Sequence, residues 1–205
     1  MSGGVEASFD VSVVCSSLER DLGGLRPAEI HSLCYLARLL AVYDDWPERS
    51  WGYDFASTKA GAPFSPRLDE AIALMVATGT LAEARETVTL SGRGRDVLER
   101  TGRLPSLARR LRCLEPACSV TLTMPLPAVT DALTQEPQLR AALSLQQTRP
   151  LLDENGLGVL RPHIDGIRMV TADIQASGVD LLVPATVWIA YLDRTRGDWE
   201  ALGAG

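Results

Sequence analysis

The sequence predicts a mainly α-helical fold with a small β component. Apolar residues recur at three- and four-residue spacing along most of the chain, as they do on the buried face of a helix. Apolar–polar alternation, which is typical of strands, is confined to short stretches near residues 51–55 and 80–90. The 205 residues are 46% apolar and 22% charged, which is ordinary for a globular protein and suffices for one sizeable core.

Two helices are expected before residue 44. A small-residue stretch at 1–9 predicts a loose terminus. A proline at a favourable first position and a broad apolar stripe predict a core helix over 27–43, which Asp44 and Asp45 interrupt. A shorter helix is expected over 10–22, with its buried face at Val11, Val14, Leu18 and Leu22.

The segment 53–101 has the clearest pattern of turns and caps. Ser65 and Ser91 each stand where a helix N-cap is expected, and Gly79 stands where a helix should end. The expected elements are a strand over 51–55, a helix over 66–78, short strands at 80–81 and 88–90, and a helix over 92–100. Helix, strand pair and capped helix in this order predict a winged-helix-like module over residues 1–102.

The remaining residues, 103–205, predict a helical extension packed on that module, with one compact domain as the alternative. The extension has no comparable landmark, and 149–162 is expected to be a loop or short strands because it contains two glycines. The helix over 181–192 is apolar on nearly all sides, which indicates burial in a bundle or in a partner. Further helices are expected over 105–114, 127–133, 136–145 and 163–176, the last with Ile164, Ile167, Val170 and Ile174 on its buried face.

Three motifs match a known family. They are Ile-His-Ser-Leu-Cys-Tyr-Leu-Ala at 30–37, Gly-Ala-Pro-Phe-Ser-Pro-Arg-Leu at 61–68 and Leu-Ser-Gly-Arg-Gly at 90–94. In these motifs the stretch 26–101 resembles the YwgA-like family of small bacterial winged-helix proteins, akin to the Panacea (SocA-like) antitoxin-associated domains, where the motifs take the forms lqKLvYLl, yGPYSeeL and LTe.G. Ala62 is an insertion relative to the family turn, and His31 replaces the usual basic residue.

Arginines are dense between residues 93 and 112, where Asp96 and Glu99 are the only acids. A winged helix beside a basic stretch is suited to grip phosphates, so a DNA-binding role is an alternative hypothesis. The helix over 66–78, which would read bases, has Asp69 and Glu70 in its first turn, and these acids would face the DNA. The candidate nucleic-acid contacts are Arg93, Arg95, Arg103, Arg109, Arg110 and Arg112.

Large aromatic residues gather between residues 46 and 64. One interpretation is a local core under the loop at 57–64. The other is an exposed anchor for a protein partner, because tryptophan and tyrosine dominate interface energetics. The candidate partner-binding residues are Trp46, Trp51, Tyr53, Phe55 and Phe64.

Catalytic and metal-binding patterns are missing from the sequence. His31 and His163 have no second ligand at suitable spacing, so we expect no metal site and no cofactor. Two glycine pairs, at 92–94 and 156–158, lack the rest of a nucleotide-binding fingerprint. Cys15, Cys34, Cys113 and Cys118 are the only cysteines, and small buried thiols are the common case. A hydrolase or transferase with dispersed residues is left open.

The sequence predicts a non-enzymatic bacterial protein-interaction or regulatory module. The family resemblance implies an antitoxin-like or adaptor-like protein, or a subunit of a multi-component system such as a defence system. A protein partner is expected, and homodimerisation through the helix over 181–192 is a further expectation. A winged-helix DNA-binding regulator is the alternative, although the net charge of −6 disfavours nucleic acid. The chain shows neither a leader nor a membrane-spanning stretch, so a cytoplasmic protein is expected.

Overall fold

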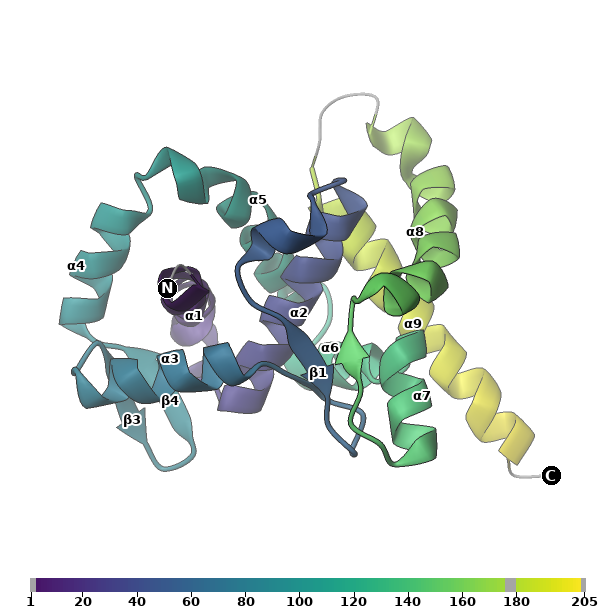
Figure 1. The fold of residues 1–205 in the computed structure, drawn as a ribbon, viewed down its shortest axis with the longest axis horizontal. Coiled ribbons are helices and arrows are strands. Elements are labelled where there is room, and N and C mark those ends of the chain that lie inside the picture. Colours follow the sequence, from purple (N-terminus) through teal and green to yellow (C-terminus); the bar gives the residue numbers. More distant parts are fainter. Residues whose placement is uncertain (1–2, 176–179, 204–205) are drawn as a thin grey trace.

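A computed structural model describes residues 3–175 and 180–203 and confirms the mainly α class, with small sheets (Figure 1). The helices are α1 (Gly3–Leu22), α2 (Pro27–Tyr43), α3 (Pro66–Ala77), α4 (Gly92–Thr101), α5 (Pro105–Ser119), α6 (Leu126–Leu133), α7 (Pro137–Leu145), α8 (Glu154–Gln175) and α9 (Leu182–Gly203). The strands are β1 (Phe55–Ser57), β2 (Pro63–Phe64), β3 (Leu81–Ala84), β4 (Thr87–Leu90) and β5 (Pro150–Leu151). Two short 3-10 turns are η1 (Glu48–Trp51) and η2 (Val120–Leu122).

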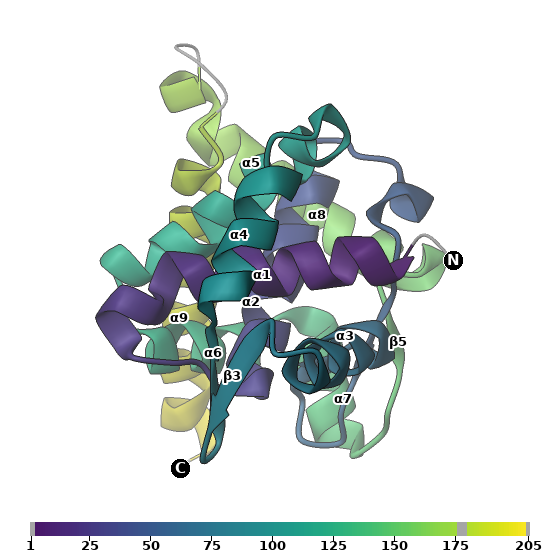
Figure 2. The ribbon, with the colours of Figure 1, turned by 90° about the vertical axis from the view of Figure 1, so that its left-hand side faces the viewer.

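Helix α1 lies at the centre of the first half of the chain. It packs against α2, α3, α4, α5 and β4, which surround it in the end-on view of Figure 1, and Figure 2 shows it from the side. The expected loose terminus at 1–9 is therefore wrong for the described residues, because the helix begins at Gly3. Leu22, expected to be buried, is 45% exposed. Neighbours on several sides bury residues outside the predicted stripe, including Ala7, Phe9 and Val13.

Helix α2 has the predicted bounds and is almost wholly buried. At its start, the backbone N–H of Arg26 donates to the carboxylate of Glu29 at 2.7 Å, which satisfies a group that the helix leaves free. At its end, Asp45 has a φ of 52°. The interruption expected after residue 43 is thus confirmed.

A three-stranded antiparallel sheet of order β2-β1-β5 joins the two halves of the chain. The expected strand over 51–55 begins later, because Trp51 belongs to the η1 turn. The β1–β2 turn contains Gly61 at a φ of 72°, where an added Cβ would lie 2.9 Å from the Cβ of Leu143. This close approach packs the turn against α7.

The helix–hairpin–helix segment from α3 to α4 follows the predicted pattern. Gly79 has a φ of 70° after α3, and the Ser91 hydroxyl accepts from the Gly94 N–H at 3.0 Å. Strands β3 and β4 form a separate antiparallel pair. Ser65 is the N-cap residue of α3, but its hydroxyl caps nothing. Its buried oxygen has no hydrogen-bond partner.

Helix α8 departs most from the sequence-based expectation. The stretch 149–162, predicted to be a loop or short strands, contributes β5 and the first turns of α8. The helix continues past Gly156 and Gly158 and through Pro162. Tertiary packing outweighs the weak local preference here, since Leu157 and Leu160 on the same turns are buried.

The two predicted parts, 1–102 and 103–205, share one hydrophobic core. Helix α5 packs on α1 and α2, and α9 packs on α2, α5, α6 and α8. Helices α7, α8 and α9 lie together on the side of the molecule away from α4 (Figure 1). None of the helices in the described part of the chain has the length and hydropathy needed to cross a bilayer.

Candidate functional site

The aromatic group lies mainly inside the protein. Trp51, Tyr53 and Phe55 have exposed fractions of 0%, 6% and 3%. The anchor role proposed for these three is therefore wrong, because an anchor must reach a partner's surface, and the local-core interpretation holds for them. Trp46 and Phe64 are half-buried. Their role in partner binding stays a prediction.

Arg110 is buried and forms an ion pair in the core. Its Nε and Nη2 donate to the carboxylate of Asp10 on α1, the latter at 2.8 Å, and its Nη1 donates to the Trp51 carbonyl at 2.7 Å. The guanidinium lies 3.9 Å from the Trp51 ring centroid, and the Tyr53 hydroxyl donates to Asp10. Burial raises the pKa of Asp10, and the Arg110 charge opposes this shift. Arg110 is thus wrong as a nucleic-acid contact, because a core residue cannot reach a phosphate.

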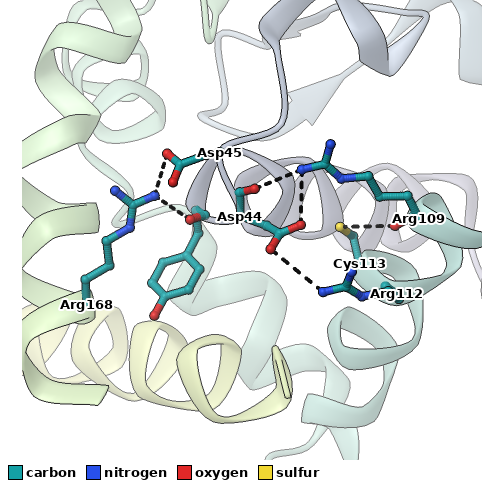
Figure 3. Close-up of polar contacts among 7 residues, drawn as sticks. Asp44, Asp45, Arg109, Arg112, Cys113 and Arg168 are labelled. Atoms are coloured by element: carbon teal, nitrogen blue, oxygen red, sulfur yellow. Dashed lines mark hydrogen bonds and ion pairs between the residues drawn. The ribbon is translucent and has the colours of Figure 1, made fainter. Parts of the chain in front are cut away.

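Arg109 and Arg112 belong to an ionic junction at the C-terminal end of α2 (Figure 3). Arg109 donates to the carbonyl of Asp44 at 2.9 Å and to its carboxylate at 3.3 Å, and Arg112 pairs with the same carboxylate at 3.8 Å. From α8, Arg168 donates to the Asp45 carboxylate at 2.7 Å. Cations stabilise the negative end of a helix dipole. The junction therefore ties α5 and α8 to the end of α2.

The other candidate arginines lie at the surface. Arg95 pairs with Glu19 at 2.7 Å and Arg103 with Glu99 at 2.5 Å, while Arg93 donates to the Thr78 carbonyl at 3.0 Å. Five of the six candidates, all except Arg93, thus form ion pairs with carboxylates of the described residues. These acids offset the positive charge that the sequence alone indicated.

The elements expected to approach DNA carry acids on their exposed faces. Glu70 of α3 pairs with Arg67 at 2.8 Å, and Asp69 is exposed beside it. The tip of the β3–β4 hairpin exposes Glu83 and Glu86. Carboxylates at these positions repel phosphates, so the geometry favours nucleic acid no more than the composition does.

His31 is buried under the turn before α3. Its Nδ1 accepts from the Ser65 N–H at 3.1 Å, and its ring stacks on Phe64 with centroids 4.9 Å apart. Nε2 of the ring is buried without a hydrogen-bond partner. Burial lowers the pKa of His31 to about 4, against the opposing charge of Asp69. The neutral ring therefore supports the turn and supplies no cation for binding.

The four cysteines are buried and free. Burial raises the pKa of Cys15, Cys113 and Cys118 to about 12, so these side chains are thiols at neutral pH and poor nucleophiles. Within the described ranges no three His, Cys, Asp or Glu side chains are grouped closely enough to hold a metal ion.

An exposed apolar surface lies on α8 and α9, which we call the α8–α9 face. Met169 is 81% exposed, Val170 67%, Val159 51% and Tyr191 46%. Beside them is a cavity of about 400 Å³, here called the apolar groove, lined by Pro162, His163, Gly166, Ile167, Val170, Val187 and Tyr191. Val170 was expected to be buried, and this expectation is wrong. The available signal was that α8 has more apolar residues than its one buried stripe needs.

A second cavity, the polar pocket, adjoins the apolar groove and has a volume of about 420 Å³. The two cavities share His163 and Tyr191. The polar side chains that line it come from α7, α8, α9 and the residue region just before α7, and they are Gln135, Arg140, Ser144, His163, Tyr191 and Thr195. Sequence analysis missed this pocket because its residues meet only in the folded chain.

Comparisons with protein-family models, with curated proteins and with solved structures found no match to this chain. The resemblance to YwgA-like proteins therefore stays a prediction.

Proposed function

We propose that this chain is a non-enzymatic protein-interaction module that binds a partner protein through the α8–α9 face. The observation that carries the proposal is the exposure of Met169 and Val170, which lie on adjacent positions of α8 beside the apolar groove. Contiguous exposed apolar side chains mark interaction sites on soluble domains more often than isolated ones do. Methionine is also common on surfaces that adapt to a partner.

The composition of the face supports a protein partner. Tyr191 presents an aromatic ring at the edge of the groove, and aromatic side chains contribute strongly to interface energies. A groove between two helices also matches a common way in which one protein binds a short segment of another. The face is therefore suited to a helix or an extended segment.

The winged-helix-like arrangement of α3, the β3–β4 hairpin and α4 is part of this proposal, as is a cytoplasmic antitoxin-like or adaptor-like role in a bacterial multi-component system. Both rest on the sequence pattern and on the family resemblance. DNA binding is the less favoured alternative, because Arg95, Arg103 and Arg109 already pair with local acids. Homodimerisation through α9 would occupy the same face.

The test is co-purification from the native bacterial host with a tagged full-length chain and with the double variant Met169→Glu/Val170→Glu. New charges on an apolar interface should remove the bound partner, which quantitative mass spectrometry would identify. The matched control is Leu74→Glu, since Leu74 is 60% exposed on α3, on the opposite side of the molecule from α8 (Figure 1). If the double variant keeps every protein that the unaltered chain recovers, the α8–α9 face is not the interaction site.

A further inference from the structure

The polar pocket and the apolar groove meet at two side chains, so they form one continuous surface. His163 and Tyr191 line both cavities, with their ring centroids 6.3 Å apart. On one side of this pair the lining is apolar, with Ile167, Val170 and Val187. On the other side it is polar and includes Arg140. A ligand crossing from one side to the other would therefore need an apolar part and a polar part.

The polar pocket has a positive charge and no counter-charge in its lining. Arg140 lines it, and none of its described lining residues is an aspartate or a glutamate. The hydroxyls of Ser144 and Thr195 donate to the carbonyls of Arg140 and Leu192, at 2.9 and 2.7 Å. The lining groups suited to donate to a ligand are thus the Arg140 guanidinium and the Tyr191 hydroxyl. This arrangement favours an acidic group.

Arg140 is held on a firmly anchored helix. Glu136, which is fully buried, caps α7 by accepting from the N–H groups of Gln138 and Leu139 at 3.1 and 3.0 Å. The Tyr35 hydroxyl of α2 also donates to Glu136, at 3.3 Å. Arg140 lies one turn after this cap, so the position of its backbone is fixed before any ligand binds. Such preorganisation reduces the entropy lost on binding.

We propose that the partner presents a peptide segment in which an acidic side chain lies next to apolar side chains. This rests on the proposed function. The acid binds at Arg140, and the apolar side chains enter the groove beside Ile167 and Val170. The groove is open to solvent, since Val170 is 67% and Tyr191 46% exposed. An open groove is better suited to a chain lying across it than to a small molecule enclosed within it.

The test is a selection of short random peptides displayed on phage, carried out against the full-length chain, and against the variants Arg140→Glu and Arg161→Glu. Peptides selected by the unaltered chain should combine Asp or Glu with neighbouring Leu, Ile, Phe or Met. Their affinity, measured by isothermal titration calorimetry, should fall about tenfold or more with Arg140→Glu. The charge reversal should also shift the selection toward Lys and Arg.

Arg161→Glu is the matched control, because it makes the same charge change at an exposed position of α8 that lines neither cavity. It should leave peptide affinity within about twofold, since exposed distant charges are screened. Circular dichroism of each variant checks that it is folded, and Arg140→Lys, which keeps the charge, serves as a second variant. Lysine should restore much of the binding that glutamate removes.

Several results would overturn the proposal. Enrichment of no peptide, enrichment of peptides without acids, or equal binding by the Arg140→Glu variant would each do so. A dimer in sedimentation velocity that Val170→Glu dissociates would make a second copy of the chain the occupant instead. If Met169 and Val170 are needed for partner binding but Arg140 is not, the acidic-segment proposal fails while the proposed function stands.

Discussion

Arg110 and Arg140 lie in two regions that use a guanidinium in opposite ways. Around Arg110, three donors meet the Asp10 carboxylate and the Trp51 carbonyl, and aromatic rings cover the group completely. Around Arg140, the pocket is open, half of the side chain is covered, and no carboxylate is among the described lining residues. Burial and internal pairing make the first arginine a part of the fold, whereas the second has the surroundings of a recognition residue.

Removing Arg110 should have the largest effect on stability. Arg110→Ala leaves the Asp10 carboxylate buried without its partner, so the free energy of unfolding should fall by about 3–5 kcal/mol. Urea denaturation followed by circular dichroism measures this. Arg103→Ala is the control, since that arginine is exposed, and it should change stability by less than about 0.5 kcal/mol. Equal losses in the two variants would contradict a structural role for the buried pair.

His31 should make stability depend on pH. Its pKa is about 4 in the folded protein and about 6.5 when unfolded, so between these values the unfolded chain binds the proton more readily. The His31 contribution is therefore fully present above about pH 6.5 and is lost as pH falls, by roughly 2–3 kcal/mol near pH 4. His31→Asn keeps an acceptor near the Ser65 N–H without this titration. The difference between the two proteins' stability–pH curves should show the loss, and parallel curves would refute it.

Glycine-to-alanine changes should have opposite effects in the two regions. A Cβ at Gly94 would lie 2.3 Å from the Thr80 carbonyl oxygen, so Gly94→Ala should destabilise the α3–α4 segment by about 1–3 kcal/mol. At Gly166, on the exposed side of α8, a Cβ would meet nothing within 4 Å. Because alanine favours a helix, Gly166→Ala should stabilise the protein by up to about 1 kcal/mol. Thermal unfolding compares the two, and a destabilised Gly166→Ala protein would show that α8 is already covered.

Substitution on the α8–α9 face should have the smallest effect on stability. Met169→Glu should change the free energy of unfolding by less than about 0.5 kcal/mol, because the side chain is 81% exposed. Differential scanning calorimetry measures the change. A larger loss would mean that Met169 supports the fold, and any loss of partner binding in that variant would then need another explanation.

Local patterns predicted much of the backbone. Helix α2 has its expected bounds because one broad apolar stripe, a first-position proline and a terminal acid pair all agree. Gly79 and Ser91 perform the roles expected of them because left-handed turns and N-caps depend on a few neighbouring residues. The first turns of α8 could not be predicted in this way, since two glycines and Pro162 weaken the local helical signal and only packing overrides it.

The sequence by itself determined the helical class, the position of most caps and turns, and the absence of familiar catalytic motifs, because these depend on residues that are close along the chain. Only the tertiary structure decided which charges are available. It brought Asp10 to Arg110 and Asp44 to Arg109 across long stretches of sequence, and it left Arg140 in an open pocket. A side chain's burial and partners arise from distant contacts, which spacing along one chain does not encode.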